Sequence, residues 1–115
     1  MPSRSGVRSA TIRKAIAYID EHLADPIDTV AIAAAAGVPV RTLQSGFHDH
    51  VGVAPMEHVR VQRLAAARRE LLDADPSGTA SVAEIAHRWG FAHLARFADR
   101  YRQAYGEKPS ETLRR

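Results

Sequence analysis

A segment of about 25 residues occurs twice in this chain, and this internal repeat limits the folds that the chain can adopt. Residues 32–37, IAAAAG, recur as residues 85–90, IAHRWG, while residues 52–55, GVAP, recur as residues 106–109, GEKP. The first pair is offset by 53 positions and the second by 54, so the second copy holds one extra residue. Two copies are too few for a solenoid, so the repeat predicts one small domain with two similar units.

Apolar residues recur at three- and four-residue steps through most of the chain, which is the pattern of amphipathic α-helices. Gly and Pro mark the ends of these segments, and no alternating strand pattern is present. The sequence therefore predicts an all-α fold of seven helices. We expect them from Ser9 or Thr11 to the Asp25-Pro26 break, from Asp28 or Thr29 to Gly37, at about 40–51, at about 55–73, from the Ser81 cap to Gly90, at about 92–105, and as a short turn from Pro109.

Each copy of the repeat is a short helix, a turn with Gly and a second helix with a polar outer face, which is the helix-turn-helix pattern. We place a flexible leader at 1–8 and one domain at 9–115. Its first helix-turn-helix unit covers about 28–52, and its second covers about 81–106. The linker helix between them spans roughly 25 Å.

The function of a lone helix-turn-helix is ambiguous, but two copies favour DNA binding, in which the second helix of each motif enters a major groove. Successive grooves on one side of B-DNA lie about 34 Å apart. The sequence therefore predicts that a monomer reads two adjacent major grooves.

Composition excludes several classes of protein. The 115 residues include no Cys, which fits a reducing cytoplasm, and no apolar run is long enough to span a membrane. The formal net charge of +3 is too small to establish a nucleic-acid partner alone. His48 and His50 are two positions apart and point away from each other on a helix, so we predict no metal site. Trp89 precedes a turn Gly and is predicted to lie in the core. We expect no catalytic residues and no cofactor, hence no enzyme.

Residues 81–115, SVAEIAHRWGFAHLARFADRYRQAYGEKPSETLRR, resemble the C-terminal signature of AraC/XylS-type transcription regulators. AIAAAAGVPVRTLQSGF and HVGVAP resemble the first unit of that family, and RLAAARRELL resembles its linker helix. The resemblance covers about residues 12–114. It implies a bacterial regulator with two helix-turn-helix subdomains, double-stranded DNA as its partner and RNA polymerase as a further contact. The sensing domain usual in the family is absent from this chain.

The chain departs from the family pattern at four positions. Pro39, Ala92 and Lys108 stand where the family usually has Ser as a helix N-cap, and losing such a cap typically costs about 1 kcal/mol. Asp99 stands where the family often has Arg, which removes one expected phosphate contact.

The resemblance also implies which residues face DNA. Arginine binds guanine and glutamine binds adenine through paired hydrogen bonds, so Arg41, Gln44 and Arg96 are the main candidates. Leu94 can contact a thymine methyl group or pack inside the protein. The full set of predicted base contacts is Arg41, Thr42, Gln44, Ser45, His93, Leu94 and Arg96. The predicted phosphate contacts, which set register rather than sequence choice, are His48, Arg63, Arg100 and Arg102.

A second interpretation belongs to another class of function. The same basic helical surface can serve as an adaptor that binds RNA polymerase or an acidic protein. The two interpretations are compatible, and the salt dependence of duplex binding discriminates between them.

Overall fold

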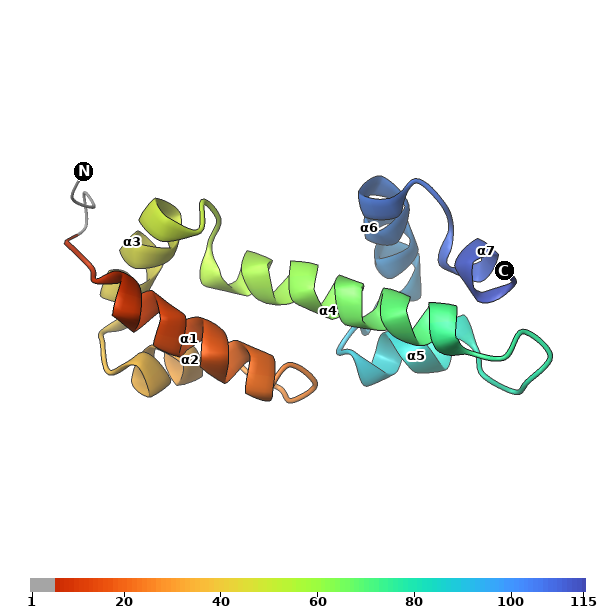
Figure 1. Ribbon diagram of the computed structural model, residues 1–115, viewed down its shortest axis with the longest axis horizontal. Coiled ribbons are helices and arrows are strands. Elements are labelled where there is room, and N and C mark those ends of the chain that lie inside the picture. Colours follow the sequence, from red (N-terminus) through yellow and green to blue (C-terminus); the bar gives the residue numbers. More distant parts are fainter. Residues whose placement is uncertain (1–5) are drawn as a thin grey trace. The chain divides into compact units, whose positions relative to one another are not determined.

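Residues 6–115 are described by the computed structural model, and this range contains seven α-helices and no β-strand (Figure 1). The all-α prediction and the predicted number of helices are confirmed. The helices are α1 (Ser9–Glu21), α2 (Thr29–Ala36), α3 (Val40–His50), α4 (Pro55–Asp73), α5 (Val82–Arg88), α6 (Leu94–Tyr105) and α7 (Pro109–Leu113).

The chain divides into two compact units, and the boundary follows Val61, inside α4. The core of unit 1 joins α1, α2, α3 and the start of α4. Ala15, Ile19, Leu43 and Phe47 are fully buried there. Gly46 permits this packing, because a Cβ atom at that position would lie only 2.6 Å from Cδ1 of Ile12. Helix α1 therefore packs directly against the backbone of α3.

Unit 2 contains the rest of α4 with α5, α6 and α7. Its buried side chains come from α4, α5 and α6, together with Pro109 and Thr112 of α7. Its three aromatic contacts run in series from the turn before α6 along that helix. The rings of Phe91 and Phe97 lie 4.9 Å apart, Phe97 and Tyr101 lie 5.8 Å apart, and Tyr101 and Tyr105 lie 4.9 Å apart. The core is completed by Leu64, Ala67, Leu71, Ile85 and Ala86.

Helix α4 serves both units. Its first turns supply Val59 to the core of unit 1, whereas its later turns supply the core of unit 2. Those later turns correspond to α1, and the five residues of α7 correspond to the first turn of α4. The repeat is thus longer than the sequence match indicates. The matching buried positions are Ile12 with Leu64, Ala15 with Ala67, Ile19 with Leu71, and Pro55 with Pro109.

The observed helix ends agree only in part with the ends predicted from capping and turn residues. The carboxylate of Asp28 accepts a 2.8 Å hydrogen bond from the Ala31 amide, and Oγ of Ser81 accepts a 3.1 Å bond from the Glu84 amide, so both predicted caps are present. Three boundaries differ: α1 ends at Glu21 rather than at the Asp25-Pro26 break, α5 ends at Arg88 rather than at Gly90, and α6 begins at Leu94. The chain is already non-helical at Trp89, which makes the second turn longer than expected.

The predicted leader is shorter than eight residues. Residues 1–5 lie outside the described range, but Val7 is buried, and its carbonyl oxygen accepts a 2.8 Å hydrogen bond from Nε2 of His50. A single residue with a partner 43 positions away leaves no periodic signal, so the sequence could not reveal this contact.

Candidate nucleic-acid interface

Helix α3 presents one polar face to solvent. Leu43 and Phe47 are fully buried on its inner side, which fixes the rotation of the helix about its axis. Because residues four and seven positions apart on a helix share a face, Arg41, Ser45 and His48 form a stripe opposite the core. All three are exposed, as is the neighbouring Gln44. Four of the predicted DNA-contacting side chains are therefore brought together on α3.

Thr42 and the end of α3 complete this face. Thr42 is half-buried at the edge of the stripe, so it has less access to a ligand than its neighbours. The helix has Pro39 as its N-cap, with no side-chain hydrogen bond to the first turn. The free amides of this turn therefore point out of the helix at the end where Arg41 lies.

Helix α6 is held in the same way by Phe97 and Tyr101, both fully buried, but its predicted contacts do not converge. Leu94 and Arg96 are separated by about 200° around the helix axis, so they lie on different sides. His93 is exposed and precedes the helix as its N-cap, a position that the sequence analysis assigned to Ala92. The extra residue in the second turn explains this error.

The repeat identifies which face of α6 corresponds to the polar stripe of α3. An offset of 54 positions relates Phe47 to Tyr101, and it relates the stripe to Ala95, Asp99 and Arg102. Arg96 corresponds to the half-buried Thr42, although Arg96 itself is exposed. The structure thus adds Ala95 to the candidate surface. It also places Asp99, which stands where the family often has Arg, on the same face of α6.

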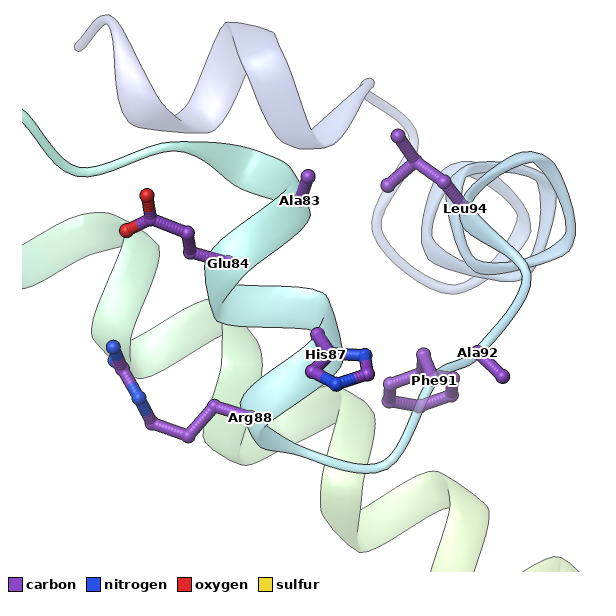
Figure 2. A pocket seen from close by; sticks show the side chains of 7 residues that line it. All are labelled: Ala83, Glu84, His87, Arg88, Phe91, Ala92 and Leu94. Atoms are coloured by element: carbon purple, nitrogen blue, oxygen red, sulfur yellow. The ribbon is translucent and has the colours of Figure 1, made fainter.

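A pocket of about 700 Å³ lies between α5 and the start of α6. Figure 2 shows Leu94 projecting from the first turn of α6 on the side of α5, with Phe91 in the intervening turn. Leu94 is 46% exposed and also lines a second, smaller pocket beside α7. Its side chain therefore covers apolar surface within unit 2. The first pocket is lined by Ala83, Glu84, His87, Arg88, Phe91, Ala92 and Leu94.

The turn between α5 and α6 is attached to α4 by polar side chains. Glu70 accepts a 3.0 Å hydrogen bond from the Trp89 indole and forms an ion pair with Arg88. The half-buried guanidinium of Arg63 lies beside Gly90, and burial lowers the pKa of Arg63. Trp89 packs against the core of unit 2, as predicted.

A partly buried polar network supports the other end of α6. The hydroxyl of Tyr101 accepts a 3.2 Å hydrogen bond from Arg68, whose guanidinium carbon lies 4.5 Å from the centre of the Tyr105 ring. Thr112 donates to the Glu107 carboxylate, and this hydrogen bond lowers the pKa of Glu107. Ion pairs with Arg68 and Arg115 hold Glu107 in place.

The described residues contain neither a metal-site cluster nor a membrane-spanning helix. No cluster of three or more His, Cys, Asp or Glu side chains with the arrangement of a metal site occurs among residues 6–115. Over the same residues, no helix has both the length and the apolar character needed to cross a bilayer.

Two exposed polar helices, each backed by a helix-turn-helix core, define a double helix-turn-helix domain of the DNA-binding type. Residues 32–115 match the family described as "Helix-turn-helix domain". The chain belongs to the AraC/XylS family of helix-turn-helix transcription regulators.

Curated relatives support this assignment. The chain is 44% identical over 103 residues to the "Probable thc operon regulatory protein" of Rhodococcus erythropolis, covering 90% of this chain and 31% of that protein. It is 38% identical over 105 residues to the "XylDLEGF operon transcriptional activator" of Pseudomonas putida, covering 90% of this chain and 32% of that protein. The chain thus spans about a third of the length of these relatives.

Solved structures have the same fold. A "probable AraC family transcriptional regulator" from Rhodopseudomonas palustris CGA009 aligns with a TM-score of 0.82 and 33% identity, over 90% of this chain and 94% of that one. The DNA-binding domain of AdpA, solved in complex with a target DNA, aligns with a TM-score of 0.77 and 29% identity, over 90% and 89% of the two chains.

Proposed function

We propose that this chain binds double-stranded DNA sequence-specifically and regulates transcription, with α3 and α6 as its recognition helices. The observation that carries the proposal is the exposed stripe of Arg41, Ser45 and His48 on a helix whose opposite side is fully buried. A rigidly backed helix with guanidinium, amide and hydroxyl groups on one face suits the donor and acceptor edges of the major groove.

We assign base contacts first to Arg41 and Gln44, because both are exposed and both can make paired hydrogen bonds. Ser45 and Thr42 extend this set on α3. On α6, the proposed base contacts are His93, Leu94 and Arg96, to which the internal repeat adds Asp99. Exposed nitrogen-bearing side chains on the later turns, namely His48, Arg100 and Arg102, are proposed to meet phosphates.

The duplicated unit supports binding to two adjacent major grooves by one copy of the chain. Such binding takes place on the chromosome, so we propose the bacterial cytoplasm as the compartment. The relatives are named as operon regulators, and this supports a role in transcription rather than in catalysis.

The test is selection of bound sequences from random duplexes, followed by titration of the selected site at several salt concentrations. Neutralising 6 to 8 phosphates gives a log-log slope of about −5 to −7. We expect a selected site with two separated blocks of preferred bases, bound by one copy of the chain. Salt-independent binding, or no enriched sequence, would refute the proposal.

A second candidate is docking to a protein such as RNA polymerase. The observation in its favour is the pocket between α5 and α6, which combines the apolar Phe91 and Leu94 with the polar Glu84 and His87. Ala83→Arg would obstruct this pocket from the exposed side of α5. Loss of transcriptional output with unchanged DNA affinity would support docking, whereas unchanged output would exclude it.

A further inference from the structure

The turn at Gly90 is in close contact with a guanidinium from α4. A methyl group on the α-carbon of Gly90 would lie 3.2 Å from Nη1, 3.4 Å from Cζ and 3.7 Å from Nε of Arg63. All three atoms belong to the guanidinium, which therefore lies against Gly90 on the side where a side chain would begin. At Gly37, the corresponding turn of unit 1, nothing lies within 4 Å of such a methyl group. The contact is therefore a property of the second unit.

Arg63 is poorly placed for the phosphate contact that the sequence predicts. It is half-buried, and burial lowers its pKa, whereas Arg100 and Arg102 are exposed cations in the same unit. An arginine side chain remains charged in proteins, so this burial costs desolvation that a contact must offset. Packing against the turn is one contact that the structure provides.

Glu70 also attaches the turn between α5 and α6 to α4. Glu70, two turns further along α4, accepts from the Trp89 indole and pairs with Arg88 at the end of α5. The turn is thus held by α4 at Trp89 and again at Gly90, immediately before the chain enters α6. By the offset that relates Ile12 to Leu64, unit 1 has Thr11 in place of Arg63 and Tyr18 in place of Glu70. The corresponding turn of unit 1 therefore lacks both of these side chains.

We propose that Arg63 is a positioning residue for sequence readout, and that its guanidinium fixes the direction in which α6 leaves the turn. This inference rests on the proposed function, because α6 must read bases for its direction to matter. It assigns Arg63 no direct contact with DNA. A lysine ammonium lacks the planar shape of the guanidinium, so Lys is not an equivalent residue here.

The first test needs no DNA and measures the contact itself. Unfolding free energies are compared for the parent, Gly90→Ala, Arg63→Met and the double variant. Gly37→Ala is the matched control, because Gly37 and Gly90 have similar positive φ angles of 73° and 86° but only Gly90 touches a guanidinium. We expect Gly90→Ala to be less costly in the Arg63→Met background, and Gly37→Ala to cost the same in both. Equal costs for Gly90→Ala in both backgrounds would overturn the proposal.

The second test measures readout with the selected duplex and a random duplex. We expect Arg63→Met and Arg63→Lys each to lower affinity for the selected duplex about tenfold, which is in the range for loss of one base contact. Base preference should relax only at the positions that α6 variants such as Arg96→Ala affect. Random-duplex affinity and the salt slope should stay unchanged. Arg69→Met, an exposed arginine on α4, is the control for lost charge.

A direct contact between Arg63 and a phosphate would give different results in the same measurements. A phosphate contact predicts equal losses on both duplexes, a salt slope smaller by about 0.9, and recovery with Arg63→Lys. That result would overturn the positioning role. If the parent chain binds no duplex, the proposed function fails and the role in readout fails with it, while the first test still reports the contact.

Discussion

The hydroxyl of Tyr101 donates a 2.7 Å hydrogen bond to Oγ1 of Thr112, and both side chains are buried. This bond connects α6 with α7. At the corresponding positions of unit 1 the pair is Phe47 and His58, whose rings meet edge to face with their centres 5.8 Å apart. The two copies of the repeat thus close the same helix junction with different chemistry, polar in one unit and aromatic in the other.

Tyr101→Phe should destabilise unit 2 by about 1 kcal/mol, because a buried hydroxyl with partners on both sides is removed while its partners remain. Tyr105→Phe is the control, since Tyr105 is half-buried and its ring remains available to the Arg68 guanidinium. Urea unfolding followed by circular dichroism measures both variants. Equal stability of the two variants would show that the Tyr101 hydroxyl contributes nothing.

The stability of unit 1 should fall below neutral pH because of His58. Nε2 of this residue is buried without a hydrogen-bond partner, and burial lowers the pKa of His58, an effect that the charge of Asp20 opposes. The unfolded chain takes up the proton near the ordinary value of 6.5, whereas the folded chain does so only at lower pH. Stability is therefore complete above pH 6.5 and declines as pH falls through the window below it, by at most about 1.4 kcal/mol per pH unit.

Unfolding free energies at pH 7.5 and pH 5.5 measure this effect. His58→Leu should remove most of the difference between the two pH values. His87→Ala, which replaces an exposed histidine on α5, should leave it intact. A parent protein equally stable at both pH values would contradict the assignment.

Gly52 has a φ of 89°, and nothing lies within 4 Å of the place where a side chain would start. Any cost of replacing it therefore comes from the backbone and not from a clash. Gly52→Val should destabilise unit 1 by more than about 1 kcal/mol, because a β-branched residue tolerates positive φ poorly. Gly52→Asn should cost less, since Asn adopts this conformation more readily. Thermal melts of the two variants provide the comparison, and identical melting would exclude a role for the turn geometry.

Arg41→Ala should weaken binding to the selected duplex by about 1 to 3 kcal/mol and relax base choice at the positions read by α3. Arg96→Ala should relax choice at different positions. Repeating the sequence selection with each variant measures these changes. If either variant loses affinity equally for the selected and the random duplex, the replaced arginine contacts phosphate instead.

Asp99→Asn should raise affinity for random duplexes, because it removes a negative charge from the face that approaches the phosphates. It should also weaken a preference for cytosine at one position, since a carboxylate accepts a hydrogen bond from the cytosine amino group. Asp73→Asn makes the same change in charge at the end of α4 and serves as control. Equal gains in random-duplex affinity for the two variants would show that Asp99 acts only through the net charge of the protein.

The periodicity of the sequence was sufficient to predict the seven helices and the two helix-turn-helix units, because both depend on local patterns of apolar residues and on Gly and Pro. Contacts that depend on distant partners were not predictable. Val7 packs on Gly46, and Arg63 lies under Gly90, yet neither pair has a signal in the local sequence.

The exposed face of α3 was predictable from the sequence, whereas that of α6 was less so. On α3 the buried Leu43 and Phe47 give the phase of the helix, so the exposed stripe follows from the sequence. On α6 the start of the helix depends on how many residues the turn takes up, and an error of one residue rotates the expected face by about 100°. The structure resolves this by placing His93 at the N-cap.

Helix α4 contributes to the cores of both units, and this determines how the domain can be divided experimentally. Val59 completes one core and Leu64, five residues later, begins the other, so no stretch between them can serve as a spacer. A fragment that carries the first unit has to continue beyond Val59, and a fragment that carries the second has to start before Leu64. Two fragments that meet between these residues retain both cores but divide α4, so each half keeps only part of this helix. A protease that cuts α4 outside this short stretch would separate a core residue from one of the two units.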